Sequence, residues 1–268
     1  DDDDDDDDDE SEEESESESE SDDEEDKESD EEDKEQVGEV KIWQQFGHPD
    51  YVPAGTVYKT LRITQASADV ITIVDYGHGN LYSIAQALNH IGAPATISAN
   101  PADLLSAERV IVPGVGAFGA AMRELHARSL VAPLREAAAA GKPMLGICLG
   151  MQLLAEHSEE FGEHGGLGLI PGNIKLLPEA GDWNEGDRIP NVGWRALNFT
   201  GTDVSYEGIT DGSMVYFVHS FHFVAEQATD VTATISFNGE AVAASVRRGN
   251  ILGFQFHPEN SGPIGLDL

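Results

Sequence analysis

The sequence has a single cysteine, Cys148, among its 268 residues. One cysteine cannot form an intramolecular disulfide, which excludes the small secreted proteins that depend on disulfide frameworks. The chain also lacks an apolar run near the roughly 20 residues that a membrane-spanning helix needs, and it lacks the basic-then-apolar pattern of a signal peptide. These absences predict a protein of the reduced cytoplasm without a membrane partner.

Positive charge is scarce as well. Lys and Arg number 15 against 51 Asp and Glu, which gives a net charge of −36. Nucleic-acid binding requires clustered Lys or Arg to neutralise phosphates, so we expect no nucleic-acid partner. The histidines show no metal-ligand spacing, and we expect neither a metal nor another cofactor.

Much of the negative charge lies at the N-terminus. Residues 1–35 contain 27 Asp or Glu and 2 Lys, with no residue more apolar than serine. Such a segment cannot bury apolar surface, and we predict a disordered acidic tail. Three interpretations of it stay open: a solvated tail without a partner, a tail that binds a basic partner or metal ions, and a tail that aids solubility in high salt.

The rest of the chain is acidic too. Subtracting the −25 of residues 1–35 from the −36 of the chain leaves −11 on residues 36–268, where only 4 of the 13 basic residues are Lys. This balance fits a halophilic cytoplasm, which is a hypothesis. Residues 36–68 match no known pattern and are interpreted as a linker or arm, whereas residues 69–268 suffice for one domain with a sizeable core.

The lone cysteine lies between glycines, in the segment Gly-Ile-Cys-Leu-Gly at 146–150. The apolar runs at 143–145 and 151–155 predict a strand before it and a helix after it, joined by a sharp turn. Glycines leave room for a residue held in a strained conformation, and the first N–H groups of the helix would favour a thiolate. The competing interpretation is a small buried cysteine without chemistry.

A histidine and a glutamate follow 109 residues downstream. In an extended chain, His257 and Glu259 would face the same side. A thiol needs a base to take its proton, and the base needs a carboxylate to hold its tautomer. Cys148, His257 and Glu259 supply these three roles. His219 and His222, in an apolar aromatic segment, are rival bases, although such surroundings are more typical of core histidines.

Residues 110–119 form an apolar run that leads into a glycine-rich loop. Backbone N–H groups near Val115 and Gly116 could stabilise the oxyanion of an acyl transfer. The loop lacks the lysine and hydroxyl of a phosphate-binding P-loop, which disfavours that role. A tight turn without chemistry is the alternative.

The cysteine turn, the Pro-Gly-Val-Gly loop and the His-Pro-Glu segment together resemble the class I, triad-type glutamine amidotransferases, over residues 69–268. Within this class, five further segments resemble the glutaminase subunits of imidazole glycerol phosphate synthase, an enzyme of histidine biosynthesis. These segments are 75–81, 167–172, 192–194, 216–220 and 257–262.

The resemblance implies an α/β, flavodoxin-like fold. It would have a mostly parallel sheet with helices on both faces, added antiparallel hairpins, and a nucleophile elbow at a strand–helix turn. The hydrophobic pattern agrees, since strand and helix alternate in the first half. Strands are predicted over 70–74, 95–98, 110–112, 144–147, 214–218, 231–236, 241–246 and 251–256. Helices are predicted over 81–91 with Asn80 as N-cap, 119–140 and 151–157.

The resemblance also implies roles for individual residues. Cys148 would attack the side-chain amide of glutamine, His257 would move the proton to the leaving ammonia, and Glu259 would orient His257. The oxyanion donors would lie at Val115, Gly116 and the Leu149 amide. The residues expected to hold glutamine are Gln152, Glu160, His219, Ser220 and Phe221.

Ammonia would then pass to a cyclase subunit in a heterodimer. Two alternatives stay open: a glutaminase that serves another ammonia-using synthetase, and a catalytically silent binding module. The chain departs from the family pattern at Asn191, Arg195 and Asn260, where His, Asn and Lys are common. We expect these three positions to face the cyclase.

Overall fold

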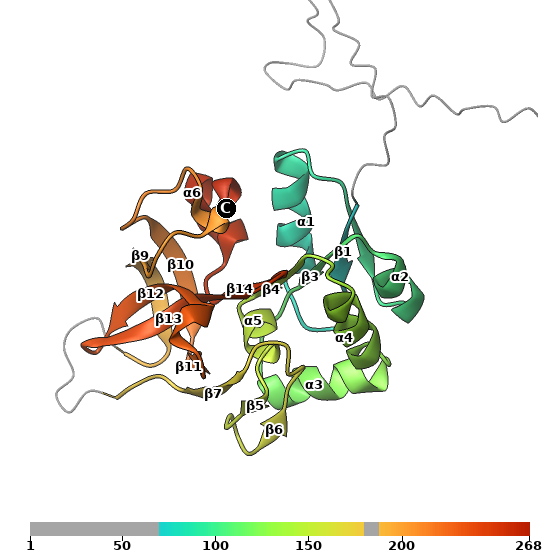
Figure 1. Ribbon diagram of the computed structural model, residues 1–268, viewed down its shortest axis with the longest axis horizontal. Helices are drawn as coiled ribbons and strands as arrows, with labels where there is room; N and C mark the ends of the chain where they lie inside the picture. The colour runs from blue at the N-terminus through green and yellow to red at the C-terminus, as the bar shows by residue number, and fades with distance from the viewer. Residues whose placement is uncertain (1–69, 180–187) are drawn as a thin grey trace, which may run out of the picture. The chain divides into compact units, whose positions relative to one another are not determined.

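The computed structural model describes residues 70–179 and 188–268 (Figure 1). The predicted tail at 1–35 and the predicted arm at 36–68 lie outside the described residues. Within the described ranges, no helix is long and apolar enough to cross a membrane.

The core of the fold is an eight-stranded sheet with the order β2-β1-β3-β4-β14-β13-β12-β9. The first five strands in this order pair in parallel, and the last three add antiparallel pairs at one edge. The mostly parallel sheet and its antiparallel extension are therefore confirmed. The strands are β1 (Ile71–Val74), β2 (Ala95–Ser98), β3 (Arg109–Val112), β4 (Met144–Ile147), β9 (Asn198–Phe199), β12 (Val231–Phe237), β13 (Glu240–Arg248) and β14 (Ile251–Phe254).

Helices cover both faces of this sheet, as predicted. Side chains alternate along each strand, so Ile73 and Ile111 pack in one cluster with Ile84 of the first helix, whereas Val74 and Val112 pack in another with the other central helices. The helices are α1 (Leu81–His90), α2 (Pro101–Ser106), α3 (Phe118–Ala127), α4 (Val131–Ala139), α5 (Leu149–Leu153) and α6 (Gly262–Asp267).

Two smaller sheets lie beside the main one. Strand β8 (Asn191–Ala196) pairs with β10 (Met214–His219). A second sheet has the order β11-β7-β5-β6, with β11 (Phe221–Ala225), β7 (Gly172–Leu176), β5 (His157–Ser158) and β6 (His164–Gly165). The strand predicted over 214–218 exists, but it belongs to the first small sheet. The chain crosses from one small sheet to the other at Ser220.

The predicted helices differ from the observed ones in extent. Asn80 does cap α1, since its side chain accepts from the Ser83 N–H at 3.4 Å. The single helix predicted over 119–140 is wrong: Ser129 has φ 57° and separates α3 from α4. A left-handed residue ends a helix, and Pro133, which has no N–H to donate, fits only the first turn of the next one. The helix predicted over 151–157 is observed as α5, which begins at Leu149 and ends at Leu153, and His157 already begins β5.

Candidate active site

Cys148 occupies the turn between β4 and α5 with φ 54° and ψ −111°, a strained conformation for a non-glycine residue. The neighbouring glycines make this turn possible. A β-carbon on Gly146 would lie 2.6 Å from the Gly150 carbonyl oxygen, and one on Gly150 would overlap the Val112 carbonyl oxygen. The sequence therefore places the cysteine on a turn that only these glycines allow. Cys148 is buried there, with 6% of its surface exposed.

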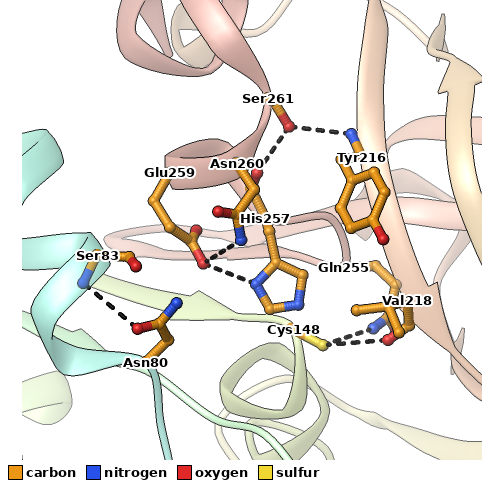
Figure 2. A network of polar contacts seen from close by, with 10 residues as sticks. All are labelled: Asn80, Ser83, Cys148, Tyr216, Val218, Gln255, His257, Glu259, Asn260 and Ser261. Carbon is orange, nitrogen blue, oxygen red and sulfur yellow. Dashed lines mark hydrogen bonds and ion pairs between the residues drawn. The ribbon is translucent and has the colours of Figure 1, made fainter.

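His257 and Glu259 follow β14, the strand next to β4. The Cys148 amide donates to the Phe254 carbonyl at 2.7 Å, which joins the two strand ends. His257 Nδ1 lies 2.8 Å from Glu259 Oε1, and Asn260 Nδ2 donates to the same oxygen at 3.3 Å. Nε2 of His257 has no hydrogen-bond partner among the described residues, and it faces the Cys148 sulfur in Figure 2. The structure thus brings the three predicted triad residues together.

The charge state of His257 follows from these neighbours. Burial lowers the pKa of His257, but the sulfur of Cys148 and the carboxylate of Glu259 together outweigh burial and raise this pKa to about 10. A raised pKa means that the site favours the protonated imidazole beside an anion. Such a histidine can give a proton to a leaving group.

Replacing Glu259 with glutamine is expected to lower the pKa of His257 by about one unit or more, because a neutral amide stabilises the imidazolium less than a carboxylate does. NMR titration of the ring measures the midpoint directly. Glu124→Gln, on the surface of α3, is the matched control and should leave the midpoint unchanged. An unaltered midpoint in Glu259→Gln would contradict the assignment.

The same shift links stability to pH. The folded-state pKa of about 10 lies above the ordinary value of 6.5, so the interaction stabilises the protein fully below pH 6.5 and is lost as pH rises toward about 10. We expect the free energy of unfolding of the wild type to fall over this window more than that of Glu259→Gln. Urea unfolding at several pH values within the window tests this; parallel curves for the two proteins would refute it.

The predicted glutamine-binding residue Gln152 lies on α5, next to the thiol. Its Nε2 donates to the Phe221 carbonyl at 2.9 Å and to Gln255 Oε1 at 3.1 Å. Gln255 Nε2 lies 3.9 Å from the Cys148 sulfur, and Val218 contributes a carbonyl at 3.8 Å. A continuous set of polar groups therefore leads from the thiol through Gln255 and Gln152 to the Phe221 carbonyl.

Sequence reasoning missed two residues at this site. Gln255 lies two positions before His257, on the same side of the extended segment, and this period-2 relation was the available signal. Tyr76 donates its hydroxyl to the Pro113 carbonyl at 2.6 Å. Burial, and then the nearby Cys148, raise the pKa of Tyr76 far above its usual range, so its hydroxyl stays protonated. Tyr76 lies in the segment 75–81 that contributes to the family resemblance, but the sequence assigned it no role.

The rival histidines are held differently. His219 Nδ1 lies 2.9 Å from the Phe221 carbonyl, and its Nε2 lies 2.9 Å from Asn191 Nδ2, so both ring nitrogens are occupied. Burial lowers the pKa of His219 to about 4. Burial also lowers the pKa of His222, on β11, to about 4. Both rings are therefore neutral at pH 7, in contrast to His257.

The predicted oxyanion loop lies against the cysteine turn. Val115 and Gly116 are exposed, and Gly116 has φ 98°. A β-carbon on Gly114 would come within 2.7 Å of the Gly150 nitrogen, so only glycine allows the loop to approach this closely. Leu149 is buried at the first position of α5. The loop and the start of α5 are therefore neighbours.

The last two predicted residues form hydrogen bonds with segments next to this region. Glu160 is 9% exposed, and its Oε2 accepts from the Phe118 N–H at 2.6 Å, immediately after the loop. The Ser220 carbonyl accepts from the Leu177 N–H at 2.9 Å, at the crossing between the small sheets. Among the residues that the structure describes, no group of three His, Cys, Asp or Glu is arranged to hold a metal ion.

The chain is similar in sequence to two proteins named HisH over most of its length. The subunit HisH of imidazole glycerol phosphate synthase from Moorella thermoacetica is 44% identical over 198 residues, which cover 74% of this chain and 91% of that protein. The subunit of the same name from Bacillus cereus is 44% identical over 199 residues, with the same coverage of both chains.

Solved structures share the fold. A crystal structure described as a glutamine amidotransferase superposes with a TM-score of 0.56 at 19% identity, covering 73% of this chain and 94% of that one. PurLQS from Thermotoga maritima gives 0.58 at 21% identity, covering 75% and 95%. The sequence model of the family Glutamine amidotransferase class-I matches residues 72–264. From this match and the 44% identity, the chain belongs to the class I glutamine amidotransferase family.

Proposed function

We propose that this chain is the glutaminase subunit of imidazole glycerol phosphate synthase. It hydrolyses glutamine to glutamate and passes the ammonia to a cyclase subunit, in a heterodimer of the cytoplasm. The observation that carries the glutaminase chemistry is the imidazole of His257, which bonds to Glu259 through Nδ1 and turns Nε2 toward the Cys148 sulfur (Figure 2). The relatives named HisH support the choice of synthase.

The first half of the reaction releases ammonia. The Cys148 thiolate attacks the side-chain amide carbon of glutamine, and the carbonyl oxygen becomes an oxyanion that N–H groups at Val115, Gly116 and Leu149 stabilise. The carbon–nitrogen bond then breaks while Nε2 of His257 gives its proton to the departing nitrogen. The products are ammonia and a thioester on Cys148.

The second half regenerates the enzyme. A water molecule attacks the thioester carbon while the now neutral Nε2 of His257 takes one of its protons. The carbon–sulfur bond breaks, glutamate leaves, and the thiolate–imidazolium pair returns. Glu259 stays charged throughout, and it holds Nδ1–H so that Nε2 keeps its direction.

The head group of glutamine is expected to lie between α5 and the loop at 115–118. Glu160 is a buried carboxylate that suits the substrate's α-ammonium group, and Gln152 offers an amide that can exchange its present partners for substrate atoms. The backbone at His219, Ser220 and Phe221 completes the proposed binding site for the head group.

Glutamate release by the purified chain, with and without a cyclase subunit and its ribonucleotide substrate, tests this function. We expect basal hydrolysis that depends on Cys148 and that rises strongly with partner and ribonucleotide. Hydrolysis without stimulation would assign the chain to another ammonia-using synthetase. No hydrolysis under any condition would favour a silent binding module.

We also propose that the acidic surface is adapted to a high-salt cytoplasm, because residues 36–268 carry a net charge of −11. Screening of this self-repulsion should raise the thermal unfolding midpoint of the full chain between low salt and about 2 M KCl. Glutaminase activity measured in parallel should rise too. A midpoint and an activity that do not respond to KCl would rule the adaptation out.

A further inference from the structure

Two of the departures from the family pattern meet in the structure. Asn191 is fully buried, so the expectation that it faces the cyclase is wrong. It lies directly opposite His219 in the pairing of β8 with β10. Its Nδ2 is 2.9 Å from His219 Nε2, and its Oδ1 accepts from Arg195 Nε at 3.0 Å. Arg195 lies four residues along the same strand and therefore on the same face. The three side chains form one chain of hydrogen bonds.

Each hydrogen bond between Arg195, Asn191, His219 and the Phe221 carbonyl has only one possible direction. The Phe221 carbonyl can only accept, so His219 carries its proton on Nδ1, and Nε2 of the neutral ring must accept. Asn191 must therefore turn its NH₂ group toward His219 and its oxygen toward Arg195, which can only donate. The Arg195 guanidinium is also held over the Phe237 ring, 5.5 Å from its centroid.

The Phe221 carbonyl connects these hydrogen bonds to the reaction centre. The Phe221 oxygen accepts from both His219 Nδ1 and Gln152 Nε2, each at 2.9 Å. Gln152 also donates to Gln255, whose amide lies against the Cys148 sulfur. A change in the protonation or position of His219 would therefore move the Phe221 carbonyl and the amide of Gln152.

We propose that Asn191 and Arg195 are positioning residues. They hold His219 as the neutral Nδ1–H tautomer, and through it they fix the Phe221 carbonyl and Gln152 in the glutamine pocket. Both residues act through His219 and not on glutamine itself. The inference rests on the proposed function for its effect on glutamine, but the tautomer of His219 can be measured in the resting protein.

The sharpest variant is Asn191→Asp, which keeps the shape of the side chain but removes its donor. A carboxylate can only accept, so His219 Nε2 must take a proton. We expect the ¹⁵N spectrum of the His219 ring at neutral pH to change from an Nδ1–H tautomer to a doubly protonated imidazolium. The KM for glutamine should rise about tenfold while kcat changes by less than about threefold, because binding that is equal in the ground state and the transition state is lost.

Arg195 gives a second, independent test. Arg195→Ala should raise the KM about fivefold, and Arg195→Lys, which keeps a donor, should restore part of the loss. In an Asn191→Ala background, Arg195→Ala should cost nothing further, because the two residues act in series. Asn198→Asp, at the exposed first residue of β9, introduces the same charge elsewhere and should change neither the spectrum nor the KM.

A wild-type His219 spectrum in Asn191→Asp would overturn the proposal. So would equal and additive KM effects of the two alanine substitutions. Thermal unfolding of each variant separates these outcomes from misfolding, and if Asn191→Asp does not fold, the Arg195→Lys and Arg195→Ala pair decides. If the wild type lacked Cys148-dependent hydrolysis, the proposed function would fail, while the ring spectra would still decide the tautomer.

Discussion

Cys148→Ala will abolish glutamine hydrolysis, with kcat falling by about a thousandfold or more. The thioester cannot form without the sulfur, and the imidazolium of His257 then has no leaving group to protonate. Glutamate release at saturating glutamine, with the cyclase and its ribonucleotide present, measures the loss. Cys148→Ser keeps a hydroxyl in the same position and should fall nearly as far, because a serine hydroxyl is far less ionised than a thiol.

The control for this variant uses the partner subunit. With ammonium salt in place of glutamine, the cyclase should still form its product, which would show that the cyclase itself is active. Co-elution of Cys148→Ala with the cyclase on size-exclusion chromatography would show that the variant folds and binds. Glutamine hydrolysis above about a hundredth of the wild-type rate would point to another nucleophile and would contradict the assignment of Cys148.

Gly150→Ala will destabilise the protein by about 3 kcal/mol or more, or will prevent folding altogether. The added β-carbon would overlap the Val112 carbonyl oxygen. The backbone of residue 150 fixes the position of that β-carbon, and the carbonyl is itself a backbone group, so neither can turn away as the end of a flexible side chain could. Urea unfolding, monitored by circular dichroism, measures the free energy of unfolding.

The matched control is Gly165→Ala on β6. An added β-carbon there would meet nothing within 4 Å, and Gly165 is exposed. Its free energy of unfolding should change by less than about 1 kcal/mol. If Gly150→Ala were as stable as this control, the close approach of the Val112 strand end to the cysteine turn would be wrong.

The first half of the sheet could be predicted closely because its strands are short apolar runs separated by helical periods. The strands predicted at 95–98 and 144–147 match β2 and β4 to the residue. The break within 119–140 could not be predicted, because a single left-handed serine, Ser129, carries it. The small sheets were also missed, since pairing β7 with β11 joins segments more than forty residues apart.

The site shows a similar division. Residue types and spacing were enough to select Cys148, His257 and Glu259 as candidates, because their chemistry is complementary. Sequence favoured His257 over His219 as the base, but it could not establish this choice, which depends on burial and on the groups that occupy the ring nitrogens. The contact between His219 and Asn191 depends on strand register, which the local pattern does not contain.

The register between β4 and β14 has a consequence for how activity is lost on heating. Ile147 pairs with Phe254, and the Cys148 amide bonds to the same strand end, so the sulfur and the imidazole are carried by adjoining central strands. Fraying of a surface loop leaves this spacing intact, whereas separating the pair requires the centre of the sheet to open. Thermal inactivation and cooperative melting should therefore occur at one temperature, with little folded but inactive protein before the transition.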